Sequence, residues 1–389
     1  LAACTTFIHS NPNALRVKII KLVMEKLIVK NFGPIKEAEI DLTKYVVFIG
    51  DTSTGKSVLA KLISIFRDFT TILNNNSDDF DKDLDFDYHL KNYNIDFNID
   101  ETIISYSDEN FEFLFQHKIL TLIKDIKTVI PAYSPFENRF PIYSNLRIKL
   151  NSSSVYFPAE RILTSLIGNT LSGLWANNVA LPNCFKIFSA NYEVARKEIL
   201  TGDYSLFGFE YKYENGDDKI ISSSENFQLS KASSGIQSLL PLLLVFDYEI
   251  KNSIYNPNLS ILIEEPELNL FPKKQKVLID YIFEKINKTS LKLIITTHSP
   301  YVLSSIDTLM LAKNTYNEHK DLKEEINAIV SENKWVDYEN ISVYEVRNDG
   351  KVYSIKNEEF RSIDTNAIDD VSDIISEEFD KLTELRYAH

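Results

Sequence analysis

A stretch of eight residues between two apolar segments constrains the fold of this chain more than any other feature. It reads Gly-Asp-Thr-Ser-Thr-Gly-Lys-Ser, follows the apolar run 45–49 and precedes a helical pattern from Val58 to Phe69. Glycines let such a loop turn tightly around a polyphosphate, the lysine binds the β- and γ-phosphates, and the serine hydroxyl ligates Mg²⁺. A strand before the loop and a helix after it distinguish a P-loop from a chance match. We therefore predict that a nucleoside triphosphate with Mg²⁺ is bound by Gly50, Asp51, Thr52, Ser53, Thr54, Gly55, Lys56 and Ser57.

The composition excludes several classes of protein. The chain has 389 residues, of which 44% are hydrophobic, so a large core can form. No apolar run reaches the length of a membrane span, so we expect no integral membrane protein and no membrane partner. The two cysteines, Cys4 and Cys184, exclude a disulfide framework and indicate a reducing, cytoplasmic compartment. The net charge of −14 argues against a surface covered with positive charge for nucleic acid, although a local basic groove stays open.

Strand-like and helix-like patterns alternate along most of the chain. We predict strands at 25–32, 35–42, 45–49, 153–157, 204–213, 218–229, 259–263 and 291–297. We predict helices at 160–175, 189–200, 238–248 and 271–287. Strands that alternate with helices around a P-loop form a mainly parallel sheet. The predicted fold is therefore α/β, with a mixed, mainly parallel sheet, antiparallel N-terminal strands and an inserted helical or lid region.

The inserted region is the least regular part of the sequence. It mixes Asp and Asn with aromatic residues, a composition that argues against plain disorder. Its aspartates, at 78, 79, 81, 83, 85 and 87, are either a metal site or, as we favour, a solvated acidic loop; Tyr88 stands where a calcium-binding loop needs glycine. The predicted segments are a disordered extension (1–23), the first core part (24–73), the insertion or lid (74–150), the second core part (151–313) and a C-terminal packing region (314–389).

Two acids follow the apolar run 261–263, at the end of a predicted buried strand. Ligands bind at this edge of parallel sheets, and a strand that ends in an acid is the Walker B arrangement. We expect Glu264 to hold Mg²⁺ and Glu265 to polarise the attacking water. Acids that favour a helix dipole are the alternative, which suits Glu267 but not the pair.

A histidine ends the next predicted strand, in Thr296-Thr297-His298-Ser299-Pro300. At this edge His298 can donate a hydrogen bond to a γ-phosphate and respond to its loss. A single histidine is more often structural. Together with the P-loop and the acidic pair, His298 indicates one shared site.

These motifs, in this order, resemble one group of proteins. The stretches are Asn31-Phe32-Gly33-Pro34-Ile35, the P-loop, Ser233-Ser234-Gly235-Ile236-Gln237, Glu-Glu-Pro-Glu and Thr-His-Ser-Pro. They are similar to those of the bacterial ABC/SMC-like P-loop ATPases related to RecF and to the overcoming-lysogenisation-defect proteins, AAA family ATPases of which many serve in phage defence. The similarity covers about 24–73 and 153–313, and it implies an ABC-type core.

The resemblance implies roles for particular residues. Ser234, Gly235 and Gln237 would lie in a signature loop that contacts the γ-phosphate bound by a second protomer, so that ATP joins a homodimer. Glu265 would be the catalytic carboxylate and His298 the switch histidine. Arg161, in a Pro-Ala-Glu-Arg stretch, would lie near the nucleotide or, as an alternative, form a surface ion pair.

Three departures from the pattern of the group affect these roles. Ile236 replaces the second glycine of the usual signature, which would weaken that contact. Asn269 and Phe271 replace a histidine and a polar residue, so the D-loop is not defined by sequence.

The function implied is an ATPase that hydrolyses ATP to ADP and phosphate and couples this reaction to DNA or to a companion effector, a nuclease or a toxin. An ATP-binding scaffold or sensor that sequesters such an effector with little turnover is the alternative, and a transporter ATPase fits less well because the spacing from Lys56 to Gly235 is long. We predict no nuclease in 314–389, where a strand pair (342–347 and 351–356) and a final amphipathic helix are expected.

Overall fold

The computed structural model describes residues 25–74, 85–97, 99–125, 154–167, 181–223, 225–364, 376–383 and 386. The predicted extension 1–23 and the aspartates at 78, 79, 81 and 83 lie outside the described residues. The division of the chain into five segments stays a prediction.

The core is a sheet of six strands in the order β15-β14-β3-β13-β12-β7. All neighbours from β14 to β7 are parallel, and β15 is antiparallel to β14. This arrangement confirms the predicted mixed, mainly parallel sheet. The strands are β3 (Tyr45–Ile49), β7 (Ser154–Phe157), β12 (Ser260–Glu264), β13 (Lys292–Thr297), β14 (Ile341–Val346) and β15 (Val352–Ser354).

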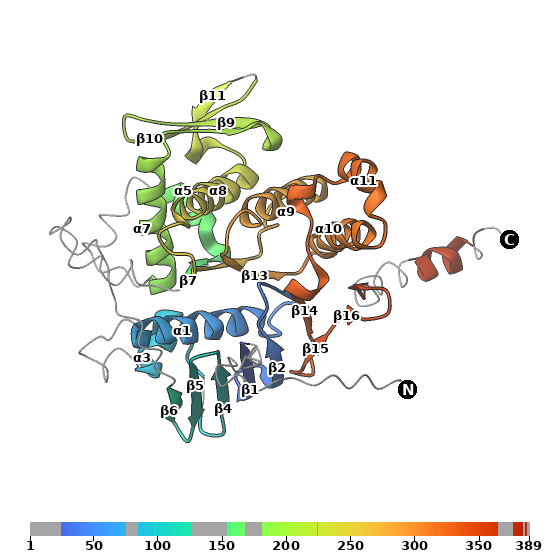
Figure 1. Cartoon of the computed structure of the whole chain (residues 1–389). Coiled ribbons are helices and arrows are strands. Elements are labelled where there is room, and N and C mark those ends of the chain that lie inside the picture. Colours follow the sequence, from blue (N-terminus) through green and yellow to red (C-terminus); the bar gives the residue numbers. More distant parts are fainter. Residues whose placement is uncertain are drawn as a thin grey trace, which may run out of the picture.

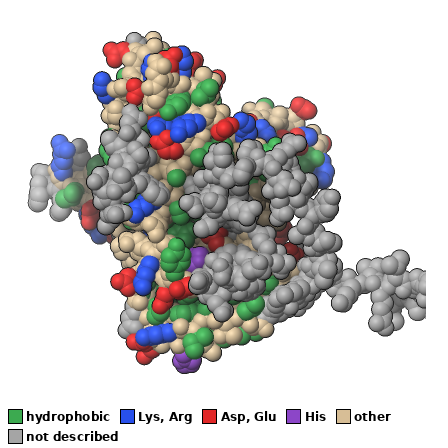
Figure 2. Space-filling model, turned by 90° about the vertical axis from the view of Figure 1, so that its left-hand side faces the viewer, with side chains coloured by type: hydrophobic (Ala, Val, Ile, Leu, Met, Phe, Trp, Pro, Cys, Tyr) green, Lys and Arg blue, Asp and Glu red, His purple; other side chains and the backbone are tan. Residues whose placement is uncertain are grey.

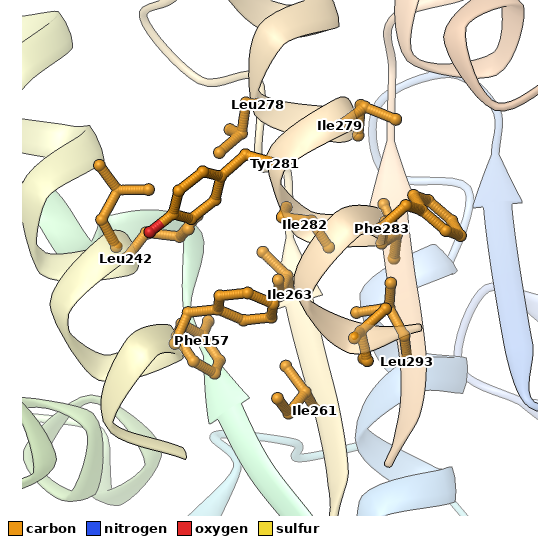
Figure 3. Packing of buried hydrophobic residues seen from close by; sticks show 14 of the residues in the cluster. Phe157, Leu242, Ile261, Ile263, Leu278, Ile279, Tyr281, Ile282, Phe283 and Leu293 are labelled. Carbon is orange, nitrogen blue, oxygen red and sulfur yellow. The ribbon is translucent and has the colours of Figure 1, made fainter. Parts of the chain in front are cut away.

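Alternate residues of each core strand belong to different hydrophobic clusters. On β3, Val47 packs with the helices on one face, and Val46 packs with α1 on the other. Both faces are therefore buried, which explains why the strands are continuously apolar. Figure 3 shows the first face, where Phe157, Ile261 and Ile263 point toward helix α9. The helices there are α5 (Ile162–Ile167), α7 (Asn183–Glu198), α8 (Ser234–Asn252), α9 (Pro272–Ile286) and α10 (Pro300–Glu318).

Helix α1 (Lys56–Asn74) lies between two sheets, as Figure 1 shows. Below it is an antiparallel sheet in the order β2-β1-β4-β5-β6. Because α1 contacts both sheets, it is buried on almost every side rather than along one stripe. The lower sheet consists of β1 (Lys26–Phe32), β2 (Ile35–Asp41), β4 (Ile103–Ser107), β5 (Phe111–Gln116) and β6 (Ile119–Asp125), accompanied by α3 (Phe86–Asn92).

Strands β4 to β6 come from the segment that we predicted as an insertion. They pair in sequence order with one another, and β4 pairs with β1. The described part of that segment is therefore one helix and three strands that continue the N-terminal sheet.

A small antiparallel sheet in the order β11-β10-β9-β8 covers the outer helices. Its strands are β8 (Thr201–Tyr204), β9 (Phe209–Glu214), β10 (Asp217–Ile221) and β11 (Asn226–Gln228). The predicted strand 218–229 is thus two strands that pair with each other.

The C-terminal strand pair was predicted, but not its place in the fold. β14 lies next to β3 in the core sheet, so residues far apart in sequence flank the P-loop strand. The other elements are α11 (Lys323–Ile329), β16 (Lys356–Asn357), β17 (Ser362–Ile363) and helical residues 376–383. Short 3-10 turns occur at Ala159–Arg161, Ser205–Phe207, Leu229–Lys231, Lys320–Leu322, Glu332–Lys334 and Tyr338–Asn340. Of the helices described, none has the length and apolar character to cross a bilayer.

Candidate nucleotide site

The P-loop joins β3 to α1 at the C-terminal edge of the core sheet, and its surroundings require its two glycines. Gly50 has a φ of 153°, and a Cβ there would lie 2.2 Å from the carbonyl oxygen of Val346 on β14. Gly55 has a φ of 110°, and a Cβ there would lie 2.5 Å from Ile35 Cδ1. A side chain at either position would displace the loop from the core sheet or from the turn between β1 and β2.

Lys56 is 4% exposed and lies inside the loop. Its Nζ donates to the carbonyl oxygens of Gly50 at 2.9 Å and Asp51 at 2.7 Å. Burial lowers the pKa of the Lys56 ammonium, and nearby carboxylates, Glu265 foremost, oppose that shift. The ammonium is therefore held by weak acceptors that the oxygens of a polyphosphate can replace.

His298 connects the lysine to the paired acids. Its Nδ1 lies 3.4 Å from Lys56 Nζ, and its Nε2 lies 3.0 Å from Glu265 Oε1. An ammonium can only donate, so Nδ1 is the acceptor, and Nε2 carries the proton that Glu265 accepts. The structure thus brings Lys56 together with Glu265 and His298, which both lie more than 200 residues further along the chain.

Glu265 follows β12 in a left-handed backbone conformation, with a φ of 42°. For a residue with a Cβ this conformation costs about 1–2 kcal/mol, so other contacts must hold it. One of them is the hydrogen bond from the Glu265 N–H to the carbonyl oxygen of Thr296, at 2.8 Å. The turn directs the Glu265 carboxylate toward His298 on the neighbouring strand's end.

Glu267 has a role that the sequence did not predict. Its Oε1 accepts hydrogen bonds from Thr297 Oγ1 at 2.6 Å and from the His298 N–H at 2.9 Å. The third acid of the Glu-Glu-Pro-Glu stretch therefore fixes the loop that carries the histidine. Ser299 then caps α10, and Pro300 begins that helix.

Several buried polar atoms around this edge have no partner among the described residues. They include Ser238 Oγ, Glu264 Oε1, Glu267 Oε2 and Thr296 Oγ1. Buried polar groups are rarely left without a hydrogen bond, so these atoms fit a site that takes an ion and its waters. Among the described residues, no group of three or more His, Cys, Asp and Glu side chains could hold a metal alone. Mg²⁺ would therefore need nucleotide oxygens beside Ser57 and Glu264, as is usual for this ion.

The signature stretch begins α8. Ser233 and Ser234 are exposed, and a Cβ on Gly235 would lie 3.0 Å from the carbonyl oxygen of Asn269. No hydrogen bond joins residues 233–235 to the P-loop within the part of the chain that the structure describes. Gln237 is buried, and its Nε2 donates to the carbonyl oxygen of Ser230 at 2.9 Å. Gln237 thus shapes the loop, whereas Ser234 is exposed and Gly235 is half-buried.

Arg161 differs most from its prediction. It is 0% exposed, so the surface ion pair that we considered is wrong. Its guanidinium donates to five backbone carbonyl oxygens, those of Pro158, Ser238, Glu264, Glu265 and Pro266. Burial lowers its pKa to about 10, which still leaves it charged at neutral pH. Arg161 therefore binds the backbone of the Walker B turn, with no donor left for a nucleotide.

One family model matches part of the chain, outside the P-loop. Residues 169–303 match a family model described as an AAA ATPase domain, a region that contains Ser234, Glu265 and His298. No curated protein matches the sequence.

Among solved structures, the chain is similar to the SMC head domain from Thermotoga maritima, with 15% identity, 72% of this chain and 91% of that chain covered, and a TM-score of 0.34. It is also similar to the recombination mediator protein RecF, with 11% identity, 85% and 98% covered, and a TM-score of 0.37. A third similar structure is an SMC head bound to the C-winged helix domain of ScpA, with 15% identity, 85% and 97% covered, and a TM-score of 0.38.

Proposed function

We propose that this chain hydrolyses Mg-ATP and that the bound nucleotide controls its dimerisation. The premise is that it is an ABC/SMC-like P-loop ATPase, which its fold and the match to an ATPase domain support. The observation that carries the proposal is the contact series from Lys56 through His298 to Glu265, at 3.4 Å and 3.0 Å. A cation for phosphate, a base for water and an imidazole between them are the groups that phosphoryl transfer to water requires.

Different residues have different roles in hydrolysis. The P-loop N–H groups and Lys56 bind the phosphates. Ser57 and Glu264 would hold Mg²⁺, which when bound would neutralise charge on the phosphate oxygens. Glu265 then accepts a hydrogen bond from the attacking water and takes its proton. His298 is released from Glu265 and donates a hydrogen bond from its Nε2–H to the γ-phosphate.

The proposed dimer rests on residues near the site whose side chains are exposed. Ser234 is exposed, and Phe271, at the start of α9, and Tyr301, in the first turn of α10, are 77% and 53% exposed. Exposed aromatic residues are enriched at protein interfaces. A second copy of the chain would bring its Ser234 and Gly235 to the γ-phosphate, so hydrolysis removes the group that joins the two copies.

The switch acts on DNA or on a companion effector, and the charge favours the effector. Figure 2 shows acidic and basic side chains intermingled on the face that it presents, and the net charge of the chain is −14. A DNA-binding face needs clustered positive charge, and its affinity falls steeply with salt. A role in phage defence, with a nuclease or a toxin as the effector, fits this arrangement.

Sedimentation of the wild type and of Glu265→Gln tests the switch. Both should be monomeric with ADP; with Mg-ATP the wild type should form transient dimers and Glu265→Gln persistent ones. The double variant Lys56→Ala/Glu265→Gln should stay monomeric, because it lacks the phosphate-binding lysine. Normal turnover by Glu265→Gln, or dimers that do not depend on nucleotide, would overturn the proposal. Persistent dimers formed by a wild type without turnover would instead support the ATP-binding scaffold.

A further inference from the structure

We propose that Arg161 is a positioning residue that links the signature helix of a protomer to the catalytic acid of the same protomer. The inference rests on the proposed function and goes beyond it, because it makes alignment of Glu265 depend on where α8 lies. One guanidinium holds both elements: Nε donates to the carbonyl oxygen of Ser238 at 3.1 Å, and Nη2 donates to that of Glu265 at 2.7 Å.

The environment of Arg161 is unusual for a buried charge. Buried arginines are normally paired with a carboxylate, because the loss of hydration otherwise opposes the charged form. Among the described residues, no carboxylate lies within hydrogen-bond distance of Arg161; nearby glutamates, Glu267 foremost, act on it at longer range. All five of its N–H donors are directed at carbonyl oxygens. A residue that only filled the core would not require a cation here.

Three of the five carbonyl groups that Arg161 binds belong to the turn that presents the catalytic acid. Glu264, Glu265 and Pro266 are consecutive residues. Arg161 donates hydrogen bonds to the backbone carbonyl oxygens of all three and forms no ion pair with the two carboxylates. Glu265 is the residue in the left-handed conformation, with a φ of 42°. The contact with Arg161 thus holds a strained residue in the orientation in which its side chain reaches His298.

The other end of the connection is the first part of α8. Ser238 lies four residues after Ser234, one turn along the helix that begins with the signature. Ser165 on α5 strengthens the same link, since its Oγ donates to the carbonyl oxygen of Gln237 at 2.5 Å. Residues 159–167 therefore connect the first turns of α8 to the end of β12, and we call this segment the bracket. When a second copy of the chain engages Ser234, the bracket transmits any shift of α8 to Glu265.

The test compares Arg161→Lys with Arg161→Ala in steady-state ATP hydrolysis. Arg161→Ala should lower kcat by about 100-fold, the effect of a misplacement of about 1 Å, while KM changes by less than about threefold because the P-loop is untouched. Arg161→Lys keeps the charge and part of the donors, so it should recover about a tenth of the wild-type kcat. Both variants should still form dimers with ATP, and these should persist longer than wild-type dimers.

Arg67 provides a matched control at the opposite edge of the same sheet. It is also a buried arginine, 4% exposed, but it is paired with Glu25. Arg67→Lys should lower the midpoint of thermal unfolding and leave kcat of the folded protein unchanged. Ser165→Ala, a milder change of the bracket, should lower kcat about threefold without a change in ATP affinity.

Two outcomes overturn the inference. One is an Arg161→Lys or Ser165→Ala protein that is folded and hydrolyses ATP at the wild-type rate while Glu265→Gln does not. The other is a loss of kcat in Arg161→Lys that is matched by the loss in Arg67→Lys, which would indicate general destabilisation. Wild-type turnover by Glu265→Gln would show instead that the proposed function itself has failed.

Discussion

Two buried arginines lie at opposite edges of the core sheet, and their partners differ. At the N-terminal edge, Arg67 donates to both carboxylate oxygens of Glu25, at 2.6 and 3.0 Å. At the C-terminal edge, the hydrogen bonds of the Arg161 guanidinium within the described part of the chain all go to backbone carbonyl oxygens. A carboxylate in a direct ion pair neutralises a buried cation and fixes two elements together. Arg161 instead binds carbonyl oxygens, and its charge is balanced at longer range by nearby carboxylates, Glu267 foremost.

The network at the N-terminal edge connects elements rather than forming a site. Glu25 also accepts from Lys292 Nζ, at the start of β13, and from Tyr106 OH on β4 at 2.7 Å. Arg67 donates to Ser260, the first residue of β12. The lower sheet, α1 and the core sheet are thus joined at one point. Changes at this edge should therefore affect stability, and changes at the other edge should affect catalysis.

The largest effect is expected from Glu265→Gln. An amide cannot take a proton from water, so kcat should fall by about 10²- to 10⁴-fold. The thermal midpoint should stay close to that of the wild type, because the side chain is partly exposed. Phosphate release under saturating Mg-ATP measures the first quantity and differential scanning calorimetry the second. Glu318→Gln, at the exposed end of α10, is the control and should change neither.

Glu25→Gln should give the opposite result. It leaves Arg67 and Lys292 without their carboxylate, and breaking a buried ion pair costs about 3–5 kcal/mol of unfolding free energy. The kcat of the folded fraction should not change. Urea unfolding followed by fluorescence gives the loss, and Glu39→Gln, in the exposed pair with Lys26, should be nearly neutral. A large loss of kcat at unchanged stability would contradict the contrast between the two edges.

The same network predicts the dependence of stability on pH. Burial alone would raise the pKa of Glu25, but the charges and hydrogen bonds of Arg67 and Lys292 outweigh it and lower the pKa from 4.5 to about 2. The stabilisation is therefore complete above the unfolded pKa and is lost as the pH falls from about 4.5 toward 2, by an amount on the order of 3 kcal/mol. Unfolding free energies measured across this window should show the decline in the wild type. In Glu25→Gln this part of the decline should disappear.

A smaller effect is expected from His298→Ala. The imidazole contributes a hydrogen bond to a charged group, so kcat should fall by about 10- to 100-fold, with little change in ATP affinity. Stopped-flow measurement of phosphate release separates hydrolysis from product release. His319→Ala, at the exposed end of α10, should behave as the wild type. Equal activity of both variants would remove His298 from the site.

The parts of the site that the sequence predicted share one property. The P-loop, Glu264-Glu265 and His298 each directly follow an apolar strand, and parallel strands end at one edge. The local sequence pattern was therefore sufficient to predict that these motifs lie close together. The role of Glu267 depends on its reach to Thr297 on the next strand, which only the tertiary structure shows.

The other differences between the predicted and the observed structure also depend on tertiary contacts. β14 joins the core beside β3, and β4 joins β1, through hydrogen bonds between residues far apart in the chain, which no local pattern specifies. Arg161 was assigned to nucleotide or to the surface because sequence shows a charge but not its partners. Backbone carbonyl groups occur at every residue, so no sequence signal identifies them as the acceptors.

Calorimetric titration of Mg-ATP into Glu265→Gln and into Lys56→Ala/Glu265→Gln tests the central claim, that three distant motifs form one site for the triphosphate. We expect one nucleotide bound per chain in the first protein and a loss of affinity of about 100-fold or more in the second, because the ammonium makes several charge-assisted hydrogen bonds to phosphate. Equal affinities in the two proteins would contradict the account.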